Sequence, residues 1–279
     1  MIIDAHQHFW KTSRGDYPWL TPDLQVLNRD YLPEDLAPIL KEHHITKTIL
    51  VQAAPTVDET EFLLKLAENT DYVAGVVGWL DLAADDFSEN FSRMRSNPKF
   101  VGLRPMLQDL NDDAWILRPE VLLNIELLVK CDFPLDLLVH PRHLPFIVEL
   151  LQRYPTLRAV IDHAAKPQIE DQIMQPWQDW MELLSRYDNV MCKLSSLITQ
   201  ADLNRWTVED IAPYVRHVVY VFGANAVMFG SDWPYCLLGG SYKQVLEALR
   251  TALPQDLTVD ELSSVFGRNA EIFYKLDRY

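Results

Sequence analysis

The chain has 279 residues, 48% of them hydrophobic and 11% aromatic, a composition that predicts a globular protein with a sizeable buried core. Its 25 lysines and arginines against 40 aspartates and glutamates give a formal net charge of -15, which disfavours nucleic acid and anionic membranes as partners. No apolar stretch reaches the ~18–20 residues of a membrane helix and the N-terminus lacks a signal-peptide pattern, so we expect a cytoplasmic protein. The three cysteines show neither a redox-pair nor a zinc-ribbon spacing.

Short apolar segments alternate with longer segments of helical period along the whole chain. Eight apolar segments are predicted to be buried strands: Ile2–Asp4, Thr48–Gln52, Val73–Trp79, Phe100–Arg104, Leu135–Val139, Ala159–Asp162, Val190–Leu194 and Val227–Gly230. Between them, apolar residues recur every three or four positions, the period of a helix packed on one face, in Glu59–Glu68, Leu122–Lys130, Leu144–Arg153, Trp177–Arg186 and Tyr242–Leu249. Further helix starts are indicated by Pro33 ahead of two acidic residues and by a capping box at Thr258 and Glu261.

Eight buried strands alternating with helices predict a parallel sheet covered on its outer face, and eight strands close a barrel. We therefore expect a single (β/α)8 TIM-barrel domain over residues 1–279. A doubly wound open sheet is the alternative. It is disfavoured because the chain has only nine glycines, and none of them forms a G-x-G-x-x-G or P-loop pattern.

Polar side chains gather where the predicted strands end, which is the end of a barrel that carries active sites. His6 and His8 lie two apart just after the first strand, and side chains two apart on a strand point to the same side. The other strand ends supply the following residues: Gln52, Trp79, Arg104, His140, Arg142, Asp162, His163, Lys193, Asp232 and Trp233. So many polar groups at one end predict a reactive site there.

Histidines combined with an aspartate support two kinds of hydrolytic chemistry. Neutral imidazoles and a carboxylate bind a divalent metal that keeps an open position for water. Without a metal, the carboxylate acts as general base on a water while neighbouring donors stabilise the oxyanion. The residues leave both alternatives open at this point.

Several motifs resemble the amidohydrolase superfamily, and more narrowly its sugar-lactone hydrolase branch, the L-fuconolactonase-like proteins. They are DAHQHFW at the N-terminus, DHAAKP from position 162, MCKLS from position 191 and FGSDWP from position 229, and the likeness covers nearly the whole chain. The resemblance implies a (β/α)8 barrel, hydrolysis of a ring ester and an acid after the eighth strand, Asp232, as general base. It also implies that His6, His8 and His163 surround the reacting carbonyl or, together with Asp232, bind a metal.

The resemblance further implies that no cofactor is required, with zinc as the alternative. Metal-binding relatives often carry lysine or glutamate at the fourth strand, whereas this chain offers Arg104. A lactone already has an activated acyl carbon, so it needs less help from a Lewis acid than an amide does. We expect Asp232 to activate water while His6, His8, His163 and Lys193 donate hydrogen bonds to the oxyanion.

Substrate binding is assigned more loosely, to a small-molecule sugar lactone. The long segment 10–30 carries Trp10 and Trp19, aromatic residues suited to stacking on a sugar ring. Arg104, Arg142 and Gln52 are expected to grip hydroxyl or carboxylate oxygens, with Trp79, His140 and Trp233 completing the site. Two other readings stay open, a zinc-dependent amidohydrolase or decarboxylase and a catalytically silent sugar-binding barrel, and both a monomer and a homo-oligomer are compatible with the sequence.

Overall fold

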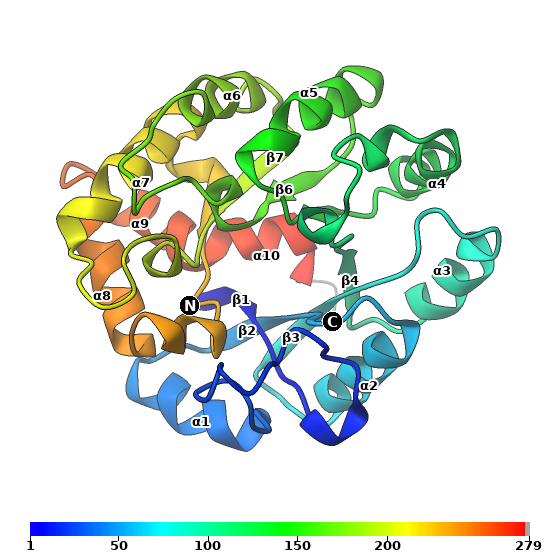
Figure 1. Ribbon diagram of the computed structural model, residues 1–279, viewed down its shortest axis with the longest axis horizontal. Helices are drawn as coiled ribbons and strands as arrows, with labels where there is room; N and C mark the ends of the chain where they lie inside the picture. Colours follow the sequence, from blue (N-terminus) through cyan, green and yellow to red (C-terminus); the bar gives the residue numbers. More distant parts are fainter. Residues whose placement is uncertain (277–279) are drawn as a thin grey trace.

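The structure is a computed structural model that describes residues 1–276. Its eight strands form one parallel sheet in the order β1 to β8 (Figure 1). They are β1 (Ile3–Gln7), β2 (Lys47–Val51), β3 (Val73–Gly78), β4 (Phe100–Leu103), β5 (Leu135–Leu137), β6 (Ala159–Ile161), β7 (Val190–Leu194) and β8 (Val227–Phe229). Each of the eight predicted strands is present, which confirms the (β/α)8 fold class.

The helices form an outer ring around the strands (Figure 1). They are α1 (Pro33–Glu42), α2 (Val57–Glu68), α3 (Phe87–Arg95), α4 (Pro119–Lys130), α5 (Leu144–Arg153), α6 (Trp177–Leu184), α7 (Val208–Phe222), α8 (Tyr242–Ala252), α9 (Val259–Ser263) and α10 (Asn269–Tyr274). The capping box predicted at the start of α9 is present, because the Thr258 hydroxyl accepts from the Glu261 amide while the Glu261 carboxylate accepts from the Thr258 amide. The apolar faces of the helices pack on the strands.

The first strand is longer than predicted, because its last residues close the barrel against the chain that follows β8. The Asp232 amide donates to the His6 carbonyl at 2.8 Å, and the His8 amide donates to the Trp233 carbonyl at 2.7 Å. Gly230 permits this approach, since a Cβ there would lie 2.7 Å from the His6 Cβ. Barrel closure therefore brings the two histidines and Asp232 to one point.

A buried carboxylate ties the same two chain segments together. Asp4 accepts hydrogen bonds from the Ser231 amide at 2.8 Å and from the Tyr242 hydroxyl at 3.0 Å. Burial raises the pKa of Asp4 to about 6, even though these donors act in the opposite direction. Asp4 is thus a structural anchor beneath the end of β1.

The barrel interior has an apolar part and a charged part. The apolar part is built from Ile3, Ala5, Ile49, Val51, Val77, Val160 and Met228, with Ala270, Phe273 and Tyr274 of α10 packed against them. Figure 1 shows α10 crossing the centre of the ring. Within residues 1–276, no helix is both long and apolar enough to span a membrane.

Candidate active site

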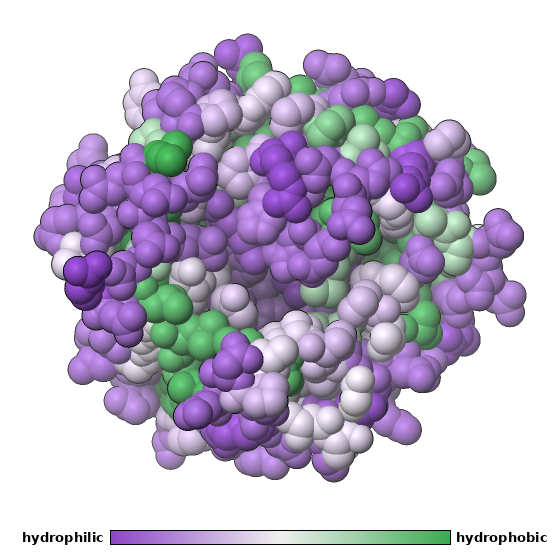
Figure 2. All heavy atoms as spheres, in the orientation of Figure 1, coloured by the Kyte–Doolittle hydropathy of each residue, from purple (hydrophilic) through white to green (hydrophobic). Residues whose placement is uncertain are grey.

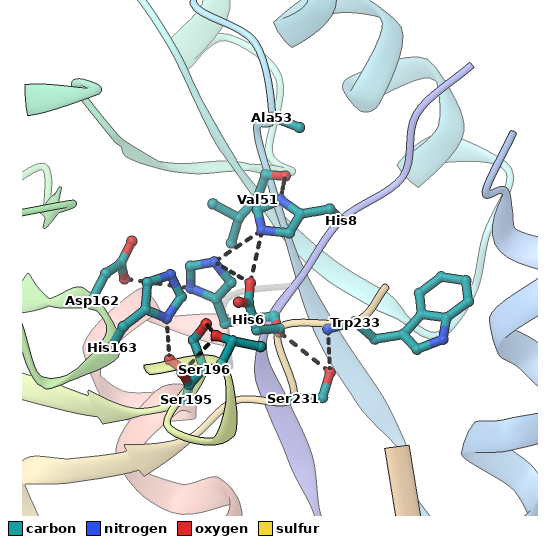
Figure 3. A network of polar contacts seen from close by, with 12 residues as sticks. His6, His8, Val51, Ala53, Asp162, His163, Ser195, Ser196, Ser231 and Trp233 are labelled. Atoms are coloured by element: carbon teal, nitrogen blue, oxygen red, sulfur yellow. Dashed lines mark hydrogen bonds and ion pairs between the residues drawn. The ribbon is translucent and has the colours of Figure 1, made fainter. Parts of the chain in front are cut away.

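Two imidazoles and one carboxylate converge at the carboxyl ends of β1 and β8 (Figure 3). His6 Nε2 lies 3.2 Å from His8 Nε2, and Asp232 Oδ1 lies 3.2 Å from His8 Nε2 and 3.6 Å from His6 Nε2. His8 Nδ1 donates to the Val51 carbonyl at 2.7 Å, which places a proton on that nitrogen and turns Nε2 toward the other two groups. The three atoms thus form a binding point for one shared cation, either a proton or a metal ion.

A third imidazole stands beside them on the segment after β6. The His163 ring centroid is 4.4 Å from that of His6, and its Nδ1 is 2.7 Å from the Ser195 hydroxyl (Figure 3). The backbone that carries it is left-handed over four consecutive non-glycine residues, with φ of 54°, 50°, 60° and 51° from His163 to Lys166. The Trp177 indole fixes this turn by donating to the Ala164 carbonyl at 2.6 Å.

A network of buried charges lies beneath the imidazoles. The Lys193 ammonium is 2.5 Å from Asp136 Oδ2, 3.0 Å from Asp162 Oδ1 and 3.3 Å from His6 Nδ1. Arg104 Nη1 lies 3.3 Å from both Asp162 Oδ2 and His6 Nε2, and its Nη2 donates to the Gln52 carbonyl. Every one of these charges has an opposite partner, as the low polarity of an interior requires.

Burial and charge set the protonation of the site. Burial lowers the pKa of His163 to about 3, although the carboxylates of Asp232 and Asp162 pull it upward. Burial likewise lowers the pKa of His6 well below its usual value. Burial alone would raise the pKa of Asp232, but the three surrounding imidazoles outweigh it and hold that pKa below the usual range. At neutral pH the site therefore presents an ionised carboxylate beside neutral His6 and His163.

These groups border a cavity of about 660 Å³ at the open end of the barrel. Figure 2 shows a hollow near the centre of the molecule, with hydrophilic residues above it and a mixture of intermediate and hydrophobic residues below it. Seven of the residues predicted from the sequence line this cavity: His8, Trp10, Trp19, Trp79, Arg104, His163 and Asp232. Trp10 is fully buried, with its indole donating to the carbonyls of Leu27 and Arg29, so it supports the segment 10–30.

Seven predicted residues, Asp162 among them, lie outside the cavity lining, and two of the seven contact each other beneath it. His6 and Lys193 are fully buried, and the Lys193 ammonium contacts His6 Nδ1 at 3.3 Å without lining the cavity. Gln52 is also fully buried and donates to the Arg104 carbonyl at 2.9 Å. Trp233 is buried against Phe9 and Tyr31.

Arg142 and His140 do not line the cavity either. Arg142 is exposed, and its guanidinium donates to Asp113 Oδ1 and to the Gln108 carbonyl, both at 2.9 Å. The His140 amide donates to the His143 ring at 3.0 Å, which caps the turn after β5. Both residues follow β5 closely in sequence, but the turn at 141–143 directs them to the rim.

Sequence reasoning missed two charged residues that the structure brings to the site. Asp136 lies inside β5 and is the closest carboxylate to Lys193, at 2.5 Å. An aspartate between leucines in a short buried strand was the available signal. Lys166 lines the cavity, and its position within DHAAKP was visible, but only the left-handed turn brings it to the opening.

The donor set at the strand ends fits a zinc ion. The three distances among His6 Nε2, His8 Nε2 and Asp232 Oδ1 are 3.2, 3.2 and 3.6 Å. Two ligands of a tetrahedral zinc with bonds of ~2.0–2.1 Å are separated by about 3.3 Å, so the spacing matches. The carbonyl bonded to His8 Nδ1 is the support that metal-bound histidines usually have. The Arg104 guanidinium beside His6 Nε2 opposes a metal through its positive charge.

A (β/α)8 barrel with an imidazole–carboxylate cluster at its strand ends is the arrangement of a barrel enzyme, whose active site lies at the carboxyl ends of the strands. A profile of the amidohydrolase family matches residues 3–276, nearly the whole described chain. The chain belongs to the amidohydrolase family.

Curated and solved relatives agree with this membership. The chain is 42% identical to an L-fucono-1,5-lactonase of Burkholderia ambifaria, over 99% of this chain and 96% of that protein. It is 36% identical to an L-fucono-1,5-lactonase of Burkholderia multivorans, over 98% of this chain and 96% of that protein. A crystal structure of an amidohydrolase from Burkholderia multivorans with bound zinc has a TM-score of 0.94 to this chain, at 35% identity over 99% of both chains.

Proposed function

We propose that the protein hydrolyses a sugar-derived aldonolactone, such as L-fuconolactone, to the hydroxy acid, and that it requires no metal to do so. The observation that carries the proposal is an ionised carboxylate, Asp232, that lines a cavity beside three imidazoles. The two relatives named L-fucono-1,5-lactonase support the choice of a lactone. The aromatic and polar lining suits a sugar ring, which has apolar faces and a polar edge.

Asp232 is the base in this reaction. Its carboxylate takes a proton from a water, and the water oxygen forms a bond to the lactone carbonyl carbon. His8 and His163 face the carbonyl. The Ser195 hydroxyl lies 2.7 Å from His163 Nδ1. With the hydroxyl as donor, the ring hydrogen is on Nε2 and donates to the oxyanion. When the ring C–O bond breaks, its electron pair passes to the ring oxygen, which takes the proton from Asp232.

The buried residues position this apparatus. Lys193 and Asp162 face His6 Nδ1, and this holds the His6 ring against His8. His6, His8 and Asp232 are also the residues that would hold a zinc ion, which supplies a Lewis acid and lowers the pKa of bound water when present.

The proposal is tested by measuring acid release from a panel of aldonolactones with a pH indicator, on chelator-treated protein and again with added zinc. We expect turnover of at least one sugar lactone without metal. No acid release without metal, together with turnover in the presence of zinc, would overturn metal independence. It would favour the hypothesis of a zinc-dependent enzyme, which the ligand spacing supports. No acid release under either condition would leave the hypothesis of a catalytically silent sugar-binding barrel.

Replacing the base gives a second test. We expect Asp232→Asn to keep the fold, because the amide has nearly the same shape, and to lower kcat by about 10²–10⁴-fold. The fold is checked by circular dichroism and Tm. A folded variant with unchanged kcat would remove Asp232 from the role of base.

A further inference from the structure

Lys166 lines the same cavity as Asp232 and His163, yet the mechanism above does not use it. Its ammonium is 2.5 Å from the side-chain oxygen of Gln108, a residue in the segment after β4. An ammonium carries three hydrogens, and this bond uses one of them. Lys166 is thus a half-buried cation held by a neutral partner at the edge of the reaction space.

Among the described residues that line the cavity, Arg104 is the other lysine or arginine, and its guanidinium already has hydrogen-bond and charge partners. Arg104 donates to the Gln52 carbonyl and pairs with Asp162, and it lies against His6 Nε2. Lys166 differs because no carboxylate accepts directly from its ammonium in the described chain. Burial lowers the pKa of Lys166, and the nearby carboxylate of Asp232 is the strongest influence in the other direction, so the two side chains are electrostatic neighbours.

The backbone that presents Lys166 is strained. Four successive non-glycine residues with φ between 50° and 60° cost about 1 kcal/mol or more each, and such strain persists where the surrounding packing enforces it. Ala164 and Ala165 are fully buried, which keeps the turn in place. The turn directs His163 and Lys166 into one cavity although they are three residues apart.

Ring opening places negative charge on a second oxygen, for which the mechanism above names no hydrogen-bond donor before Asp232 returns its proton. The oxyanion of the carbonyl has His163 as a donor, but the ring oxygen also gains negative charge as its bond to the acyl carbon breaks. We propose that the Lys166 ammonium binds this leaving ring oxygen and stabilises its charge until the proton from Asp232 neutralises it. Lys166 keeps its own protons throughout, so the balance of the reaction is unchanged. The inference rests on the proposed lactone hydrolysis.

The experiment compares two leaving groups. Wild type, Lys166→Met and Lys166→Arg are assayed on L-fuconolactone, which releases an alkoxide, and on dihydrocoumarin, which releases a more stable phenoxide. We expect Lys166→Met to lose about 10²–10³-fold in kcat on the sugar lactone, the usual cost of one lost donor. The loss on dihydrocoumarin is expected to be less than about tenfold, and Lys166→Arg is expected to restore part of the activity. The matched control is Lys243→Met, an exposed lysine on α8.

A second measurement needs the sugar lactone alone. If Lys166 stabilises the leaving oxygen, bond breaking becomes slower in Lys166→Met, and the ¹⁸O isotope effect of the ring oxygen on kcat/KM rises. An unchanged isotope effect, or equal losses on both substrates, would overturn the assignment of Lys166. A wild-type protein that hydrolyses no lactone would instead overturn the proposed function, so the two failures are distinguishable.

Discussion

Lys193 is a fully buried cation that acts on the site through its neighbours. It lies between the carboxylates of Asp136 and Asp162, and its ammonium faces His6 Nδ1 at 3.3 Å. Burial alone would raise the pKa of Asp162, but the attraction of Lys193 and His6 holds it well below its usual range. The ammonium therefore stabilises two buried carboxylates, of which Asp162 also pairs with Arg104.

Removing the Lys193 ammonium tests how much its pairing with the buried carboxylates stabilises the fold. We expect Lys193→Met to lower the free energy of unfolding by about 3–5 kcal/mol, because it leaves Asp136 without a charge partner and Asp162 with Arg104 alone. The double variant Lys193→Met/Asp136→Asn is expected to recover part of this loss, since the unpaired charge of Asp136 is gone. Urea unfolding of the wild type and the three variants, the single Asp136→Asn included, gives the coupling. Additive losses would show that the two groups do not stabilise each other.

For single residues, the sequence predicted which side chains come to the site better than it predicted what each side chain contacts there. His8, His163 and Asp232 were predicted for the site and line the cavity. Lys193 was predicted as an oxyanion donor, but alternation along β7 turns it into the barrel interior beneath His6. Strand ends are visible in a sequence, whereas the depth of a side chain depends on the register of neighbouring strands. Their roles in catalysis remain predictions.

Helix α2 carries a buried acid that holds the loop after β2. Glu59 is fully buried, and its carboxylate accepts from the Ala53 amide at 2.9 Å and from the Ala54 amide at 3.0 Å. Ala53 also accepts from the Trp19 indole at 2.9 Å, so the loop links α2 to the segment 10–30. Burial raises the pKa of Glu59 to about 8, although the two amides act in the opposite direction.

This raised pKa predicts a pH-dependent stability. Between the ordinary glutamate pKa of 4.5 and the folded-state pKa of about 8, the folded protein binds a proton at Glu59 that the unfolded chain releases. The stabilising contribution is full below pH 4.5 and is lost as the pH rises through 8. We expect Glu59→Gln to show a smaller decline in Tm between pH 5 and 8 than the wild type does.

The matched control is Glu61→Gln, a half-exposed acid on the same helix that pairs with Arg93. Its Tm profile is expected to follow that of the wild type. Identical profiles for all three proteins would show that Glu59 is ionised in the folded state across this range, and the raised pKa would be wrong.

The predicted elements overlap the observed ones, but several boundaries differ, and at two of them polar groups are the reason. Helix α2 begins at Val57 rather than Glu59, because Thr56 caps it by accepting from the Glu59 amide. The apolar period detects the packed face of a helix but not a polar first turn. Strand β1 continues to Gln7 because its hydrogen-bond partners come from residues 232 and 233, far along the chain.

The whole molecule is closed at one end by its last described helix and open at the other. Helix α10 places Phe273 and Tyr274 against the apolar part of the barrel interior. The Tyr274 hydroxyl donates to Asp136 Oδ2 at 2.8 Å, and the Lys193 ammonium lies 5.6 Å from its ring centroid. A continuous set of contacts thus runs from α10 through Asp136 and Lys193 to His6. The eight-strand barrel was predictable from apolar periodicity, but this set was not, because it depends on which residues meet inside the barrel.

The role of this set of contacts is tested by removing one oxygen. Burial raises the pKa of Tyr274 well above its usual value, so the hydroxyl stays a donor at neutral pH. We expect Tyr274→Phe to lower the free energy of unfolding by about 1–3 kcal/mol, the cost of leaving a buried acceptor with one donor fewer. Lys193 still pairs with Asp136 in this variant, so kcat on a lactone substrate is expected to change by less than about threefold. Unfolding in urea and steady-state kinetics on the same samples separate the two effects. A large loss of kcat at unchanged stability would show that the hydroxyl tunes the charge of the site from the far end of the barrel, and that α10 belongs to the catalytic apparatus rather than to the closure of the fold.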